Sequence, residues 1–185
     1  MNANACFVGA TSMKSIDPLL LALHGHWVRA DSIKERVRLD IAEGRRERPS
    51  ELDEIGQQLS KVAALEVLYG LIYVVIEGFR ELGCKDERVE QLLAEGEYVD
   101  LLRRFRNGVF HYQTEPLDKR LVDFITRDNS GRWVRDTHRA LGAFLERELP
   151  IKEGIERYGK ILSGDVEMTE NESMLKRIVK RLFAT

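Results

Sequence analysis

A single helical period running from Leu52 to Leu82 constrains the fold of this chain more than any other feature. Apolar residues recur there at three- and four-residue steps: Leu52, Ile55, Leu59, Val62, Leu65, Leu68, Ile72, Val75, Phe79 and Leu82. This spacing predicts one α-helix, which at 1.5 Å per residue is roughly 50 Å long. Gly83 is a typical C-terminal cap. Because its second half is apolar on nearly every side, we expect this helix at the centre of a bundle, or both central and interfacial.

The same spacing recurs on both sides of this segment. Asp17-Pro18 marks a helix start, and the apolar period then continues to about Ala42. Further helices are predicted over approximately residues 87–95, 98–112, 117–127, 132–148, 152–162 and 174–183. Since no strand alternation is evident, the sequence predicts an all-α fold, an up-and-down helical bundle with additional C-terminal helices. We expect residues 1–14 to form a flexible N-terminal arm and residues 15–185 to form a single α-helical domain.

Composition excludes several classes of protein. Charged residues make up 32% and hydrophobic residues 43% of the chain, which is typical of a soluble globular protein. The formal net charge is −2, so binding of nucleic acid would require a local basic patch. The most apolar run, Val62–Phe79, contains Glu66 and Glu77. We therefore expect a buried or interfacial helix and no contact with a membrane.

The two cysteines form no disulfide framework, which together with the N-terminal residues indicates a reducing cytosol. Cys6 and Cys84 stand in unrelated contexts, without metal-ligand spacing. The sequence contains no H-E-x-x-H, Walker or dinucleotide-binding motif, so we predict neither a metal nor a cofactor. The first residues lack the pattern of a signal peptide, and we predict a cytoplasmic protein.

The stretch YVDLLRRFRNGVFHY, residues 98–112, combines a core stripe with a distinctive polar face. On a helical wheel, a stripe within about 60° of Phe105 contains Tyr98, Leu101, Leu102, Val109 and Tyr112. Gly108 lies at the edge of the stripe, where another helix could approach closely. The opposite side carries Asp100, Arg103, Asn107 and His111, with Arg104 beside them and Arg106 on the flank. An ordinary solvent-exposed helix surface would explain this polar face. The face is unusual, however, in grouping an imidazole, an amide and several fixed positive charges.

The segment Arg106-Asn107-Gly108-Val109-Phe110-His111 has the form R-N-x-x-x-H. It resembles the R-x(4–6)-H signature of the HEPN superfamily (higher eukaryotes and prokaryotes nucleotide-binding domain). Members of that superfamily are α-helical bundles, and many are metal-independent endoribonucleases of toxin–antitoxin, phage-defence and RNA-processing systems. A polar residue after the arginine, often Asn, is also typical. The resemblance covers this motif and the all-helical layout.

The resemblance implies RNA cleavage in which the ribose 2′-OH attacks the phosphate and leaves a 2′,3′-cyclic phosphate. His111 would transfer protons, Arg106 would neutralise the non-bridging oxygens, and Asn107 would orient the imidazole or the phosphate. Arg103 and Arg104 would add positive charge for the RNA backbone. One chain offers one motif histidine, and the family brings two together by dimerising with its motif helices facing across a twofold axis. A homodimer is therefore expected, with an antitoxin protein as a candidate further partner.

Three further polar residues bear on this candidate site. Glu77 lies in the apolar segment LIYVVIEGF and is a supporting candidate, because a buried acid needs a partner such as Arg106 or His111. Alternatively, Glu77 is a carboxylate at the solvent-exposed end of the bundle and has no part in the site. Tyr112 directly follows His111, which departs from the H-x-Y arrangement of the modified tyrosine in some HEPN toxins. His138 is expected alone on a polar helix face.

Two further hypotheses stay open. The chain could be a non-catalytic helical module of the same or a similar fold that binds a protein or a nucleic acid through the polar face. Alternatively, it could be a helical dimer with a purely structural role, based on the long Leu52–Leu82 helix.

Overall fold

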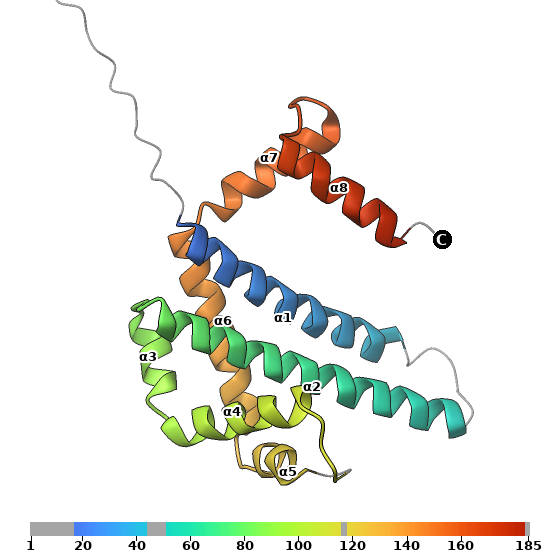
Figure 1. Cartoon of the computed structure of the whole chain (residues 1–185), viewed down its shortest axis with the longest axis vertical. Coiled ribbons are helices and arrows are strands. Elements are labelled where there is room, and N and C mark those ends of the chain that lie inside the picture. The colour runs from blue at the N-terminus through green and yellow to red at the C-terminus, as the bar shows by residue number, and fades with distance from the viewer. Residues whose placement is uncertain (1–16, 44–50, 116–117, 184–185) are drawn as a thin grey trace, which may run out of the picture. The chain divides into compact units, whose positions relative to one another are not determined.

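The protein is all-α across the residues that the computed structural model describes, which are 17–43, 51–115 and 118–183 (Figure 1). Its helices are α1 (Pro18–Glu43), α2 (Glu51–Glu81), α3 (Glu87–Leu93), α4 (Gly96–Phe110), α5 (Lys119–Ile125), α6 (Ser130–Glu148), α7 (Ile151–Ser163) and α8 (Glu170–Phe183). No strand occurs within these ranges. The predicted helical bundle with additional C-terminal helices is confirmed.

Contacts between residues divide the chain into two compact units, Met1–Leu145 and Glu146–Thr185. The first unit contains α1 to α5 and most of α6. The second contains α7 and α8, which are joined by the ion pair between Arg157 and Glu172 at 3.2 Å. Because two compact units can belong to one domain, the single domain over residues 15–185 stays a prediction. The predicted N-terminal arm lies outside the described residues.

In the first unit, α1 and α2 form a long antiparallel hairpin (Figure 1). The side chain of Asp17 accepts a hydrogen bond from the backbone N–H of Leu19 at 2.9 Å, so the predicted helix start is confirmed. Gly83 has a φ of 63° and follows the end of α2, as predicted for a C-terminal cap. The second half of α2 is central, because Ile72, Val75, Ile76 and Phe79 are buried.

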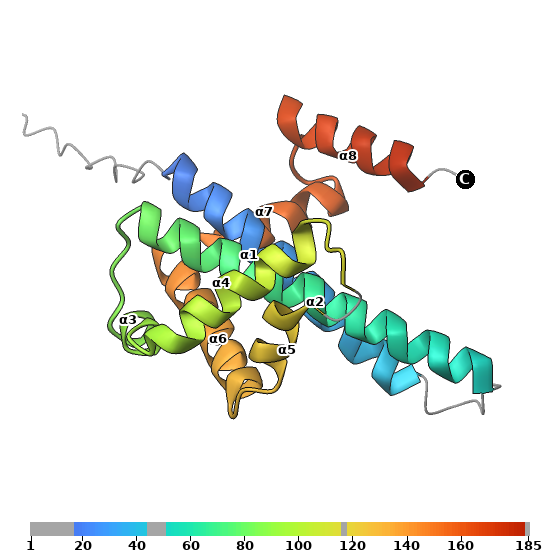
Figure 2. The ribbon, with the colours of Figure 1, turned by 60° about the horizontal axis from the view of Figure 1, so that its bottom comes forward.

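The helix α4 packs against the second half of α2, and α5 packs against α4 (Figure 2). An aromatic cluster joins the three helices: the Phe105 ring lies 5.9 Å from the ring of Tyr69 and 5.3 Å from that of Phe124. A Cβ atom on Gly108 would lie 3.0 Å from Leu121 Cδ2. This close approach of α5 confirms the prediction that another helix could come near Gly108.

The prediction for His138 is wrong, because this side chain is buried. Its ring stacks on the indole of Trp27 with centroids 5.0 Å apart, and its backbone carbonyl accepts a hydrogen bond from Trp27 Nε1 at 3.0 Å. Because Trp27 belongs to α1, the apolar period of α6 alone could not predict that its side chain would bury His138. His138 Nε2 has no hydrogen-bond partner among the described residues, and Asp31 Oδ1 lies 3.8 Å away.

Burial of His138 predicts a loss of stability in mild acid. Burial and the nearby Lys34 ammonium lower the pKa of His138 from 6.5 to about 4, against the opposing charge of Asp31. Between these pH values the unfolded chain binds a proton that the folded chain does not bind, so the free energy of unfolding decreases as the pH falls. We expect His138→Phe, which keeps an aromatic ring, to gain about 2 kcal/mol relative to wild type between pH 7 and pH 5.

Urea unfolding of both proteins at several pH values measures this difference. His111→Phe, which changes an exposed histidine, is the control and should show no such gain. A His138→Phe difference that stays constant from pH 7 to pH 5 would contradict the assignment.

Candidate functional site at the end of helix α4

The motif helix ends earlier than its sequence pattern predicts. Phe110 is the last residue of α4, and His111 has extended backbone angles of φ −120° and ψ 144°. The wheel positions of His111 and Tyr112 therefore do not apply. Tyr112 is 92% exposed, so its predicted place in the core stripe is wrong, whereas Phe105 is buried as predicted.

The side chain of Gln113 supplies a physical reason for this helix end. Its Nε2 donates to the backbone carbonyl of His111 at 2.6 Å and to that of Asn107 at 3.4 Å. Carbonyl groups in the last turn of a helix have no partner within the helix. A side chain that binds them stabilises a turn away from the helix, which leaves His111 exposed.

Arg106 is held firmly on the flank of α4. Its Nη2 donates to Glu77 Oε2 at 2.8 Å, and its Nη1 donates to Asn107 Oδ1 at 3.0 Å. Its guanidinium lies over the Tyr73 ring, 5.5 Å from the centroid. The pairing of Glu77 with Arg106 is thus present, as the sequence suggested. The part that Glu77 would play in a reaction stays a prediction.

Tyr73 adds a neutral hydroxyl to this site. Burial, reinforced by the Glu77 carboxylate, raises the pKa of the Tyr73 phenol above its usual value. The positive charges of Arg103 and Arg106 oppose this effect and lower the pKa of the same hydroxyl. The structure therefore brings two of the motif arginines to one side of α4, next to α2.

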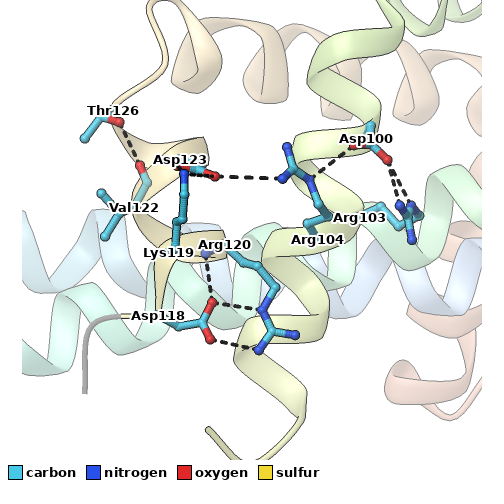
Figure 3. A network of polar contacts seen from close by, with 9 residues as sticks. All are labelled: Asp100, Arg103, Arg104, Asp118, Lys119, Arg120, Val122, Asp123 and Thr126. Atoms are coloured by element: carbon cyan, nitrogen blue, oxygen red, sulfur yellow. Dashed lines mark hydrogen bonds and ion pairs between the residues drawn. The ribbon is translucent and has the colours of Figure 1, made fainter. Parts of the chain in front are cut away.

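Arg104 faces a different neighbour. Its Nε lies 3.2 Å from Asp100 Oδ2, and its Nη1 lies 3.8 Å from Asp123 Oδ2 on α5 (Figure 3). Arg103 Nη2 binds the other oxygen of Asp100 at 2.7 Å, and this pairing lowers the pKa of Asp100. Both predicted RNA-binding arginines are therefore partly neutralised by carboxylates within the chain.

Sequence reasoning missed a chain of polar contacts that reaches the motif from α5. Arg120 Nη2 donates to Gln113 Oε1, and the same guanidinium is held by Asp118 at 2.8 and 2.9 Å (Figure 3). Asp118 also accepts from the backbone N–H of Arg120, and this environment lowers the pKa of the Asp118 carboxyl to about 2. The sequence signal was an Asp followed two residues later by Arg at the start of a predicted helix.

The hydrogen bonds of the Arg106 guanidinium go to Glu77 and Asn107 and not to His111. Among the described residues, no hydrogen bond or ion pair joins another side chain to its imidazole. A search of those residues for groups of three or more His, Cys, Asp or Glu side chains able to hold a metal found none. At this site one chain thus presents one exposed imidazole, five residues after a guanidinium that Glu77 and Asn107 orient.

Comparison of the chain with protein-family models, curated proteins and solved structures found no match.

The Gln113 contacts predict how the segment after α4 responds to mutation. Gln113→Leu keeps the size of the side chain but removes both hydrogen bonds to the carbonyls of Asn107 and His111. We expect faster exchange of the backbone amides over residues 107–115, by about fivefold for a lost bond worth about 1 kcal/mol. Hydrogen–deuterium exchange with mass spectrometry measures this change.

Gln91→Leu is the matched control. Gln91 donates only to Glu87, one turn earlier on α3, at 3.3 Å. Its replacement should leave residues 107–115 unaffected. Equal exchange in wild type and Gln113→Leu would show that Gln113 does not hold this segment.

Proposed function

We propose that this protein is a metal-independent endoribonuclease that works as a homodimer. The observation that carries the proposal is the combination of an oriented guanidinium, Arg106, with an accessible imidazole, His111, at the end of one helix. Attack of the 2′-OH on the adjacent phosphate needs a proton acceptor, a proton donor for the leaving 5′-oxygen, and positive charge at the phosphorane. These two side chains supply the residue types for all three tasks when two copies of the chain meet.

Proton transfer is assigned to the two histidines of the dimer. His111 accepts the proton of the 2′-OH, and the partner subunit's His111 donates a proton to the 5′-oxygen as the P–O bond breaks. The products are a 2′,3′-cyclic phosphate and a free 5′-hydroxyl. Histidine is the residue type suited to both tasks, because the ordinary pKa of an imidazole lies near neutral pH.

Arg106 is assigned to the phosphate. The bonds to Glu77 and Asn107 use two of the five N–H donors of the guanidinium, so others stay accessible to the non-bridging oxygens. A donor that is held before the substrate arrives requires little reorganisation during the reaction. Arg103 and Arg104 are assigned to the RNA backbone flanking the cleaved bond. The resemblance of the motif favours a toxin–antitoxin or phage-defence setting in the cytoplasm, with an antitoxin as a further partner.

A second candidate function is a non-catalytic module that binds a protein or nucleic acid through the same face. The specific observation in its favour is that Arg103, Arg104 and Arg106 all have carboxylate partners within the chain. Such ion pairs fix the orientation and partner specificity of a binding surface, and they leave it little net positive charge.

The proposed reaction predicts a strict dependence on His111. Purified wild type should cleave mixed RNA in the presence of EDTA and leave cyclic-phosphate ends. His111→Ala should lower the rate by a factor of about 10² to 10⁴, which is the usual contribution of general acid–base catalysis. His26→Ala, at a histidine of α1 outside the motif, is the control and should retain the wild-type rate.

Circular dichroism must show that the variants are folded. If wild type cleaves nothing at high protein concentration, the enzyme proposal fails, and the second candidate becomes the one to test by RNA-binding titration.

The position of Glu77 predicts a smaller effect. Glu77→Gln keeps a hydrogen-bond acceptor for Arg106 but removes the charge that fixes its guanidinium, so we expect a rate about tenfold lower. The loss of stability should be about 1 kcal/mol or less, because both side chains are partly exposed. RNA cleavage and thermal unfolding measure the two effects separately.

Glu97→Gln is the matched control, since Glu97 pairs with Arg127 at 2.7 Å away from the motif. If Glu77→Gln cleaves RNA as fast as Glu97→Gln, Glu77 has no supporting role in the reaction.

A further inference from the structure

We infer that Arg80, near the end of α2, binds a phosphate group of the RNA strand and that the hollow beside it receives the base of the same nucleotide. The hollow, termed the α2–α3 depression, has a volume of about 340 Å³. Its lining includes Phe79, Leu93 and Ala94 together with Arg80, Lys85 and Glu90. The choice of RNA as the ligand rests on the proposed function.

Arg80 belongs to the same side of α2 as the residues that orient the motif. Tyr73, Glu77 and Arg80 recur at helical spacing, so their side chains leave α2 on one side. That side meets α4, since Arg106 binds Glu77 at 2.8 Å and lies over the Tyr73 ring. The positive charge of Arg80 opposes the rise in the pKa of the Tyr73 phenol, as do the charges of two arginines of α4. Arg80 therefore lies with these residues and with Arg103 on one surface, termed the α2–α4 face.

Arg80 is the arginine of this face whose charge is not compensated by a carboxylate. Arg103 is bound to Asp100 at 2.7 Å (Figure 3), and Arg106 is bound to Glu77. In the part of the chain that the structure describes, no ion pair joins a carboxylate to Arg80, and its side chain is exposed. A guanidinium in this state presents the paired N–H donors that phosphate oxygens accept.

A contact with α3 places the guanidinium of Arg80 at the edge of the α2–α3 depression. Its Nη2 donates to the backbone carbonyl of Leu93, the last residue of α3, at 3.5 Å. This bond uses one of five N–H donors, so the others stay accessible to a phosphate. Because Leu93 also lines the depression, the guanidinium lies between the α2–α4 face and the depression. A phosphate bound to Arg80 would therefore bring its own nucleotide over the depression.

The α2–α3 depression suits a base better than a second phosphate. Phe79 and Leu93 are buried and give it an apolar lining. Lys85 pairs with Glu90 at 3.1 Å, so the charges of these two lining residues oppose each other. The volume lies at the lower end of the range for small-molecule pockets, which is about 300–1,000 Å³. An uncharged planar ring therefore fits this lining.

The subsite lies away from the bond that is cleaved. Phe110, the last residue of α4, lies against Gly70 of α2. Arg106 lies one turn earlier on α4 and binds further along α2, so the two helices run in opposite directions (Figure 1). From Gly70 to Arg80, α2 rises roughly 15 Å. Since successive phosphates of a strand lie only a few ångströms apart along its axis, Arg80 holds a nucleotide several positions from the bond cleaved at His111.

Fluorescence anisotropy of a labelled single-stranded RNA, measured at several salt concentrations, tests the proposal. Every protein carries His111→Ala, so that the RNA stays intact. Arg80→Gln should weaken binding about tenfold, and it should reduce the slope of log affinity against log salt by about 0.7, the contribution of one single-strand phosphate contact. Ala94→Trp, which fills the depression without changing the charge, should weaken binding at least about fivefold and leave the slope unchanged.

Arg38→Gln is the matched control. The side chain of Arg38 is 72% exposed, and it pairs with Glu35 at 2.8 Å on α1, outside the α2–α4 face. This variant removes the same charge as Arg80→Gln, but it should leave both the affinity and the salt slope unchanged. Circular dichroism should show that all the proteins are equally helical.

Three results would overturn the proposal. One is a parent protein that binds no RNA at about 100 μM. Another is the same salt slope for Arg80→Gln and Arg38→Gln, or an Ala94→Trp variant that binds RNA as tightly as its parent. The third comes from titration with AMP, which distinguishes a free nucleotide from the strand: Arg80-dependent binding of AMP without an effect of Arg80→Gln on RNA binding.

The outcome is separable from that of the ribonuclease proposal, because binding is measured without cleavage. Arg80-dependent RNA binding by a protein whose wild type cleaves nothing would keep the subsite and remove the enzyme. Cleavage of subsaturating RNA at an unchanged rate by Arg80→Gln, in the otherwise wild-type chain, would keep the enzyme and remove the subsite.

Discussion

Burial of the second half of α2 is the constraint on which the first unit depends. Val75 and Ile76 are fully buried, and Phe79 packs edge-to-face on Phe144 of α6 with ring centroids 5.1 Å apart. Tyr73 and Glu77 lie one turn apart on the same helix, at the margin of that core. Because the core fixes the rotation of α2, it also fixes where Glu77 presents its carboxylate, and through Glu77 it fixes the guanidinium of Arg106.

The motif therefore depends on two kinds of support. Arg106 is oriented from α2 by a residue next to the core, while the segment carrying His111 is held from α5 through Gln113, Arg120 and Asp118. The first support is partly buried and packed. The second consists of polar contacts near the surface, which are individually weak. His111 is accordingly the more adaptable of the two proposed catalytic groups.

The helices were predictable because their apolar residues follow the 3.6-residue period and their ends carry local signals such as Asp17 and Gly83. The pairing of Glu77 with Arg106 was also accessible, since an acid in an apolar segment needs a cation. What could not be predicted depends on side-chain contacts that the 3.6-residue period does not encode. Trp27 covers His138 from another helix, and Gln113 competes for the carbonyls that would have continued α4. The wheel placed Tyr112 in the core only because it assumed that the helix goes on.

The two halves of α2 have different surroundings although their sequence period is the same. A continuous apolar face has no local reason to change at Leu65, yet α4 covers it only as far as Phe110. Chain length explains the difference, because α4 has 15 residues and α2 has 31, so α4 cannot cover the whole face. Gln113 binds the carbonyls at the end of α4, where Phe110 lies against Gly70 of α2. The exposure of His111 and the limit of the α4 cover over α2 thus both follow from the point at which α4 ends.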